Sequence, residues 1–374
     1  MATAAHQAHI VDGTRGCTVD VVAVADGPGR RRYRRFVSSV YADDPHYRRV
    51  NEPFREDFLG RQDRYARRCF VRPVLVSDGG RPLVAAILVA SDDSPVLRIS
   101  FPEFTPDADA ALRCLVAYAT NLARARGLTT LSIGINGQIS YGFGILEHDG
   151  SARPEFNSTY NPAYYTAVLD GLEFSKTLAH AYAYTVAELE ARREDDVLAT
   201  LAKTYTYRAL DRRRWRDETL LFGELCDRTL AGTPHYSPKS AAEMADTIAP
   251  LRWIIGPADI IFAFQGAEPV GVVYIHPDYA ENLAGPRTGS IGLAIAARRR
   301  PSTTMIADFV GVLPGHRRSG LSLGLLYEAL RRNRSWATQI RSTFVMDANQ
   351  PSRQLTSSRA RGTHRTYALY EKEL

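Results

Sequence analysis

The sequence contains little cysteine and no long hydrophobic run. Its four cysteines lack the spacing of a zinc site or of a disulfide framework, so neither a bound metal nor a disulfide is expected. No apolar stretch approaches the roughly 18 residues that a membrane helix needs, and the first ~18 residues lack the apolar core of a signal peptide. These absences predict a cytoplasmic protein that does not contact a membrane. The cysteines are Cys17, Cys69, Cys114 and Cys226.

Lysine is also scarce, so arginine carries almost all of the positive charge behind a net charge of +6. Arginines gather in two runs, residues 30–35 and 207–216, and we expect both runs on helices. Such a run usually forms the solvated face of a helix. The alternative is that arginines interleaved with aromatic residues bind RNA phosphate and stack on bases, whereas DNA is not expected. In that case the contacts are Arg208, Arg212, Arg213 and Arg214.

A loop in the last quarter of the chain has the features of an anion site. Residues 305–312 are apolar enough for a buried strand, Pro314 ends it, and residues 322–330 have the apolar period of a helix. The loop therefore opens a helix, whose first backbone amides attract anions such as pyrophosphate. It lacks the Gly-Lys-Ser/Thr of a nucleotide-hydrolase loop and the three glycines of a dinucleotide fingerprint. The residues expected at the anion are Arg317, Arg318, Ser319, Gly320, Leu321 and Ser322.

The spacing Arg317-x-x-Gly320-x-Ser322 resembles the acyl-CoA pyrophosphate loop of the GNAT superfamily (Gcn5-related N-acetyltransferases). The expected order of elements is also similar to that family. The resemblance implies an acyl-CoA donor whose acyl group lies between two splayed strands, beside Val310 and Val312. It further implies that Asn349 contacts the pantetheine arm, for which the alternative is a helix cap. The other expected elements are a hairpin at 259–264 and 269–275, a strand at 341–348, a helix at 352–358 and a strand at 366–371.

Acyl transfer to an amine needs a base, a polarised carbonyl and an acid for the leaving thiol. The resemblance places a carboxylate base at Asp308, for which the alternative is a polar residue at a strand edge. The usual thiol acid of the family is a tyrosine seven residues after the asparagine, but that position is Thr356 here. Tyr367 and Tyr370 on the final strand are the candidate replacements. We expect His276, at the end of a strand, to lie at the surface, and the alternative is that it serves as a base on the substrate side.

The length of 374 residues predicts two domains, because the GNAT-like block fills only the second half. A loose tail of residues 1–18 precedes a first domain at 19–190, which repeats the same order of elements, and a second domain at 191–374. The expected fold is α/β, a tandem GNAT fold in which two mixed central sheets are flanked by helices. Residues 101–107 replace the pyrophosphate loop in the first half and carry two carboxylates, so no coenzyme A is expected there.

The first half contributes aromatic and amide groups that suit a pocket for a small-molecule amine, although turns and packing explain them equally well. Three functions remain open. The first is an acyl-CoA-dependent N-acyltransferase of specialised metabolism, and the second is an aminoacyl-tRNA-dependent transferase that forms an amide. The third is a GNAT-fold ligand-binding protein without catalysis. The residues expected in the pocket are Tyr141, Tyr160, Asn161 and Tyr164.

Overall fold

The computed structural model describes residues 7–8, 17–23, 25–49, 52–147, 153–190, 194–281, 283, 295, 302–357, 360 and 362–374. Residues 1–6 and 9–16 of the expected tail lie outside this set. The chain forms two compact units that interleave in the sequence: Met1–Ala152, Asn157–Leu178 and Tyr367–Leu374 in the first, Arg153–Phe156 and Ala179–Thr366 in the second. The expected boundary at residues 190 and 191 stays a prediction about independently folding domains.

The first unit is built on a mixed sheet whose strands follow the order β1-β2-β3-β4-β5-β6-β15. All neighbours are antiparallel except β5 and β6, which run parallel. The last strand of the chain therefore completes the sheet of the first unit. The strands are β1 (Gln7–Ala8), β2 (Cys17–Val21), β3 (Phe70–Asp78), β4 (Arg81–Ala90), β5 (Val96–Phe104), β6 (Thr130–Ile133), β7 (Ile145–Glu147), which pairs with β15, and β15 (Thr363–Glu373).

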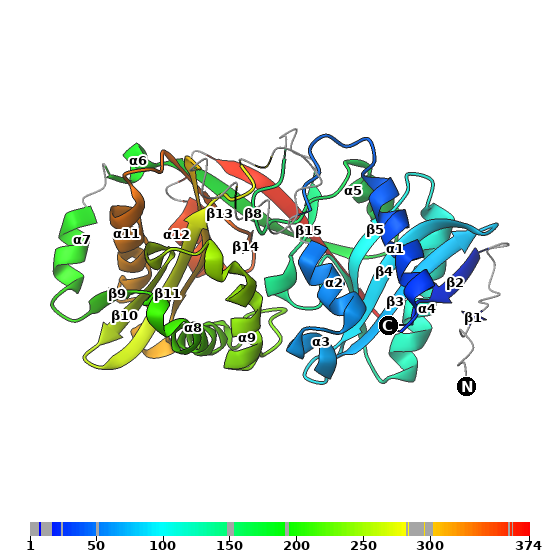
Figure 1. Ribbon diagram of the computed structural model, residues 1–374, viewed down its shortest axis with the longest axis horizontal. Helices are drawn as coiled ribbons and strands as arrows, with labels where there is room; N and C mark the ends of the chain where they lie inside the picture. The colour runs from blue at the N-terminus through cyan, green and yellow to red at the C-terminus, as the bar shows by residue number, and fades with distance from the viewer. Residues whose placement is uncertain are drawn as a thin grey trace. The chain divides into compact units, whose positions relative to one another are not determined.

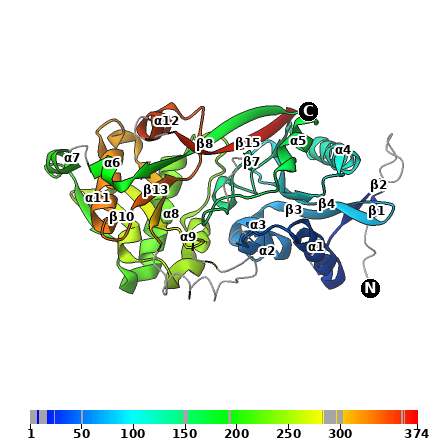
Figure 2. The same ribbon diagram turned by 90° about the horizontal axis from the view of Figure 1, so that it is seen from above.

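Helices cover both faces of this sheet. Figures 1 and 2 place α4 on one face of β3 and β4, and α1, α2 and α3 on the other. The apolar residues of α1 recur at helical spacing, so Tyr33, Phe36 and Val37 are buried on one side while four of its five arginines are exposed. Each face thus has its own hydrophobic core. The helices are α1 (Gly27–Val40), α2 (Glu52–Gly60), α3 (Arg64–Arg68), α4 (Asp109–Ala125) and α5 (Tyr164–Asp170).

The second unit repeats the plan with strands in the order β8-β13-β12-β11-β10-β9, of which only β12 and β13 run parallel. Helices α7 and α11 pack with one core, and α8 and α9 with the core on the opposite face. The strands are β8 (Ser175–Thr185), β9 (Thr206–Ala209), β10 (Ile260–Gln265), β11 (Glu268–Pro277), β12 (Thr304–Val312), β13 (Gln339–Ser342) and β14 (Val345–Met346). The helices are α6 (Val186–Glu190), α7 (Glu194–Leu201), α8 (Trp215–Leu230), α9 (Ala241–Ile248), α11 (Leu321–Asn333) and α12 (Gln350–Ser357).

The predicted α/β fold class with mixed sheets between helices is confirmed, and so are the predicted hairpin and the strand and helix around the loop. Two predictions are wrong in part. Residues 207–214 are not helical, because residues 207–209 belong to edge strand β9, which pairs with β10, and 212–214 form a short 3-10 turn before α8. The strand predicted at 341–348 is broken into β13 and β14, which pair with different residues of β8. Among the described residues, no helix combines the length and apolarity needed to cross a membrane.

Candidate functional site

Strand β12 carries a β-bulge at Asp308. Its pairing with β11 places Ala307 opposite Ile275 and Phe309 opposite Tyr274, so Asp308 is an extra residue with no counterpart. The bulge coincides with the end of the parallel pairing between β12 and β13, which the described residues show only from Thr304 to Ala307. Beyond that point β14 pairs with β8 instead. The two neighbouring strands therefore part after Ala307 and leave one side of β12 open.

Two backbone amides point into this opening. The amide of Leu313 donates to the carbonyl of Val270 on β11 at 2.9 Å. Because bonded and non-bonded residues alternate along an antiparallel strand, Gly311 and Phe309 also face β11. The amides of Val310 and Val312 consequently face the side that β13 has left. Backbone donors in such a place can bind a carbonyl oxygen.

The loop after β12 leads directly into α11. A 3-10 turn at Pro314–His316 is followed by two residues with left-handed backbone, Arg318 with φ 66° and Gly320 with φ 86°. Gly320 is the N-cap of α11, and no side chain caps the helix from that position. A Cβ built on Gly320 would meet no atom within 4 Å, so the space beside it is open. The first turn of α11 therefore presents amides and a positive dipole end to an accessible surface.

The basic and hydroxyl side chains of the loop differ in what they contact. Arg317 turns back and donates to the carbonyl of Thr229 at 3.0 Å, which anchors the loop to the end of α8. Ser319 accepts from the amide of Leu321 at 3.2 Å. Arg318 is exposed and has no hydrogen bond or ion pair among the described residues. Of the two arginines, Arg318 is thus the one available to an anion.

The charge of Asp308 acts on three buried side chains, Tyr274, His276 and Cys226. Burial raises the pKa of Tyr274, and the negative charge of Asp308 raises it further. Burial lowers the pKa of His276, and the same carboxylate only partly offsets that effect. Cys226 of α8 also has a raised pKa, from burial first and Asp308 second. The carboxylate therefore lies near these three side chains.

The prediction that His276 lies at the surface is wrong, because its side chain is fully buried. Its Nδ1 lies 2.8 Å from the carbonyl oxygen of Pro277, and its ring stacks on Tyr279 with centroids 5.3 Å apart. Among the described residues its Nε2 has no hydrogen-bond partner. With the proton on Nδ1, Nε2 is an acceptor without a donor. Tyr274 and His276 alternate along β11, so both side chains lie on one buried face of the strand, and this spacing is visible in the sequence.

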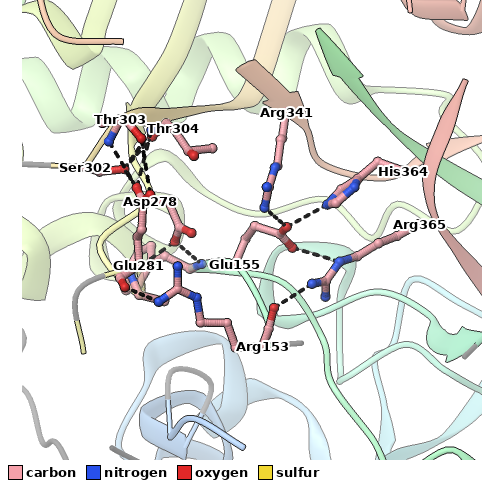
Figure 3. A network of polar contacts seen from close by, with 12 residues as sticks. Arg153, Glu155, Asp278, Glu281, Ser302, Thr303, Thr304, Arg341, His364 and Arg365 are labelled. Carbon is pink, nitrogen blue, oxygen red and sulfur yellow. Dashed lines mark hydrogen bonds and ion pairs between the residues drawn. The ribbon is translucent and has the colours of Figure 1, made fainter. Parts of the chain in front are cut away.

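A short segment, Arg153–Phe156, packs on the second unit beside His276. The Phe156 ring meets the His276 ring edge-on with centroids 5.4 Å apart. Figure 3 shows the buried Glu155 between three basic side chains: Arg341 at 2.6 Å, His364 at 2.8 Å and Arg365 at 3.1 Å. Although burial alone would raise the pKa of Glu155, the hydrogen bond from His364 and the two arginine charges hold it at about 2. The segment is thus fixed to the second unit by a buried ionic cluster.

Asn349 precedes α12, and its side-chain oxygen accepts from the amide of Ser352 at 3.3 Å. This contact is the helix cap that we gave as the alternative, and a contact with pantetheine stays a prediction. Thr356 stands on α12, where its hydroxyl donates to the carbonyl of Ser352 at 2.8 Å. The hydroxyl of Tyr184 on β8 donates to the carbonyl of Thr356 at 3.1 Å.

In the first unit, strand β5 corresponds to β12, and its equivalent backbone amides are either missing or bonded within the unit. The amide of Thr105 donates to the carbonyl of Leu83, as Leu313 does to Val270, so Phe104 corresponds to Val312 and Pro102 to Val310. Proline has no backbone N–H and cannot donate a hydrogen bond. The amide of Phe104 donates to the hydroxyl of Tyr165 at 2.9 Å, which occupies the other donor. These contacts support the expectation that the first half does not bind coenzyme A.

Glu103 lies buried on the same strand, β5. It accepts from the hydroxyls of Tyr41 at 2.7 Å and Tyr165 at 2.8 Å, and Arg55 lies 3.6 Å away. Burial raises the pKa of Glu103 to about 7, against the opposing effect of Arg55. The carboxyl therefore fills a polar core. The sequence led us to expect that it would repel an anion, but a buried carboxyl does not do so at the surface.

The remaining predicted residues of the pocket and of catalysis lie in the first unit, and most are hydrogen-bonded to side chains or backbone groups of that unit. Tyr141 donates to Asp63 at 2.9 Å, and Tyr160 donates to Asp44 at 2.7 Å. Asn161 exchanges hydrogen bonds with the backbone of Leu146, and Tyr164 donates to the carbonyl of Phe104. Tyr370 donates to Asp170 at 2.8 Å, and Tyr367 is buried. Asp308 and the loop belong to the second unit, and the roles assigned to all of these residues stay predictions.

The arginines proposed for RNA are largely engaged within the second unit. Arg208 pairs with the buried Glu218 at 2.9 Å, Arg212 donates to the carbonyl of Arg252, and Arg214 lies 3.4 Å from Asp217. Their expected role in RNA binding stays a prediction. Within the part of the chain that is described, no group of three or more His, Cys, Asp or Glu side chains is placed to hold a metal ion.

No protein-family model and no curated protein matches this sequence. Solved structures do match at the level of the fold. A tandem GNAT protein from the clavulanic acid biosynthesis pathway is 12% identical with a TM-score of 0.52, over 96% of this chain and 98% of its own. A GNAT-related glucosamine N-acetyltransferase region of a fungal multi-domain β-N-acetylglucosaminidase is 13% identical with a TM-score of 0.56, over 97% of this chain and 38% of that one.

A GNAT-related protein from Kribbella flavida is 11% identical with a TM-score of 0.51, over 97% of this chain and 73% of its own. At these identities the likeness concerns the fold and not the substrate. The bulge, the parting of β12 from β13 and the loop before α11 occur in the unit that keeps its opening, while the other unit has closed it. The chain has the fold of the tandem GNAT proteins.

Proposed function

We propose that this chain is an N-acyltransferase that takes an acyl group from acyl-CoA and transfers it to the amine of a small molecule. The observation that carries the proposal is the opening beside β12, where two strand amides and the start of α11 lie along one chain segment. Amides of this kind suit a thioester carbonyl, and a helix N-terminus suits a pyrophosphate. An acyl-CoA donor would supply an activated thioester. The clavulanic acid protein in the comparison makes specialised metabolism a reasonable setting.

In this proposal Asp308 is the base. Its carboxylate takes a proton from the ammonium of the acceptor, directly or through water, so that the neutral amine can attack the thioester carbonyl. The amides of Val310 and Val312 hold the carbonyl oxygen as negative charge develops on it. The nitrogen bonds to the carbonyl carbon, the C–S bond breaks as the carbonyl re-forms, and the thiolate takes up the proton that the nitrogen loses. Arg318 and the amides at the start of α11 hold the pyrophosphate.

The test is calorimetric binding of coenzyme A and acetyl-CoA to the full chain and to Gly320→Glu. The new side chain adds a carboxylate at the proposed pyrophosphate site, and we expect at least a tenfold rise in Kd. The matched control is Gly266→Glu in the turn between β10 and β11, because Gly266 also has positive φ, 61°, and a Cβ added there would meet no atom within 4 Å. Both variants pay a similar backbone cost of about 1 kcal/mol.

Failure of the wild-type chain to bind either ligand, or equal weakening in the two variants, would overturn the proposal. A parallel gel shift with bulk tRNA at two salt concentrations addresses the second hypothesis. Retention of tRNA without binding of coenzyme A would favour aminoacyl transfer. Binding of neither would favour the non-catalytic protein.

A further inference from the structure

A cavity of about 370 Å³ lies on the first unit, between the end of β2, the start of β3 and the ends of α3 and α4. Four arginines line it, and Asp92 is the one acidic residue among its lining. A ligand site for a small molecule commonly starts at about this volume. The cavity is far in sequence from Asp308 and the loop before α11. The four arginines are Arg61, Arg68, Arg72 and Arg126.

Three of these guanidinium groups are held in place by neutral partners. Arg61 donates to the backbone carbonyls of Arg67 and Cys69, both at 3.0 Å. Arg72 bonds to the hydroxyl of Tyr118 at 2.9 Å. Arg72 and Arg126 also lie against the same ring, that of Phe70, at 5.1 and 4.0 Å from its centroid. These contacts fix the position of the charges without cancelling them.

Three other arginines of the first unit pair with carboxylates. Arg32 pairs with Asp20 at 3.0 Å, Arg34 pairs with Glu56, and Arg81 pairs with Asp107. In the cavity, only Arg68 has an ion pair among the described residues, at 3.7 Å from Asp93. The contrast indicates that the cavity keeps an excess of positive charge that the protein does not balance.

Gathering like charges costs free energy, and ordering each arginine costs side-chain entropy. An anion in the cavity offsets both costs. Guanidinium groups with fixed planes match the oxygens of phosphate, to which they donate two hydrogen bonds at once. We propose that this cavity binds a phosphorylated small molecule of about mononucleotide size through Arg61, Arg72 and Arg126. The site is separate from the proposed acyl-CoA site and does not rest on the acyl-transfer proposal.

The experiment measures binding of pyrophosphate and ADP by calorimetry at 20 and 200 mM salt. Every protein carries Gly320→Glu, so that the loop before α11 does not contribute. In that background we compare Arg126→Gln and Arg72→Gln with Arg113→Gln. Arg113 is the matched control, because it is exposed on α4 and, among the described residues, donates only to a backbone carbonyl, that of Gly171. Because Arg126 is exposed, its substitution should not disturb folding, which circular dichroism checks.

We expect pyrophosphate or ADP to bind, the Kd to rise at least tenfold in Arg126→Gln and Arg72→Gln, and Arg113→Gln to behave like its parent. Weaker binding at the higher salt is part of the expectation. Absence of binding at 20 mM salt, or equal binding by all three variants, would overturn the proposal. A 12-nucleotide single-stranded RNA is a further probe. Tight RNA binding that depends on Arg126, without binding of either small phosphate, would replace the proposed ligand with a nucleic acid.

Discussion

Replacing Glu103 by glutamine should remove a pH dependence from the stability of the first unit. The carboxyl is buried, accepts from Tyr41 and Tyr165, and has its pKa raised from 4.5 to about 7 mainly by burial. Glutamine has nearly the same shape and can still accept one tyrosine hydrogen bond. It cannot ionise. The variant therefore isolates the free energy of placing a negative charge in this core.

The magnitude follows from the two pKa values. Below pH 4.5 the carboxyl is protonated in both the folded and the unfolded chain, so its ionisation costs nothing. As the pH rises towards 7 the unfolded carboxyl ionises first, and the free energy of unfolding falls. Above pH 7 the loss levels off at about 3 kcal/mol, because each pKa unit is worth about 1.4 kcal/mol. Between pH 5 and pH 8 the wild-type chain should thus lose about 2.5 kcal/mol more stability than the Glu103→Gln chain, because the unfolded carboxyl is already partly ionised at pH 5.

The assay is urea unfolding at pH 5 and pH 8, with hydrogen exchange of β5 peptides as the probe of the first unit. Tryptophan fluorescence reports the second unit, because Trp215, Trp253 and Trp336 all belong to it. Glu173→Gln is the matched control, since the Glu173 side chain is 89% exposed. If Glu103→Gln and wild type lose equal stability over this pH range, the burial argument is refuted. Carboxyls of the second unit cancel in this comparison.

Three further outcomes are expected. Asp308→Asn should lower kcat for acyl transfer about a hundredfold or more while acetyl-CoA still binds, and kinetics with calorimetry measure both. Asn136→Ala should lower the free energy of unfolding by about 1–3 kcal/mol, because the buried amide of Phe101 loses its acceptor at 2.6 Å; denaturant titration checks this. All four cysteines are buried and have raised pKa values, so a thiol reagent should react with the unfolded chain and hardly with the native one. Rapid native labelling would contradict that reading.

The elements around the loop were predictable from sequence because their apolar periods are clear and Pro314 and Gly320 mark the breaks. The arginine run was harder, since Arg208 and Ala209 favour a helix yet pair with β10 as part of edge strand β9. Tertiary pairing overrode local preference there. Likewise, a polar residue such as His276 at the end of a strand looks exposed until the helix and segment that cover it are known.

The loss of free backbone amides on β5 of the first unit could not be predicted from the sequence. Pro102 removes an amide, which is visible in the sequence, yet only the strand register shows that it corresponds to Val310. Tyr165, which occupies the amide of Phe104, stands 61 residues from it, and Asn136, which binds the nearby amide of Phe101, stands 35 residues from that group. No local pattern announces such contacts. The two units differ at this position because of the strand register and long-range hydrogen bonds, which the spacing of residues in the sequence does not reveal.

Strand β15 completes the sheet of the first unit, and this has a consequence for synthesis of the chain. Residues 370–373 of β15 pair with residues 130–133 of β6, so the sheet of the first unit remains one strand short until residues 367–374 have left the ribosome. Meanwhile β6 has an exposed edge, which invites association with other chains. A deletion of residues 367–374 would therefore destabilise the first unit, most of which is synthesised before the second. The sheet of the first unit thus depends on a strand that follows the second unit in the chain.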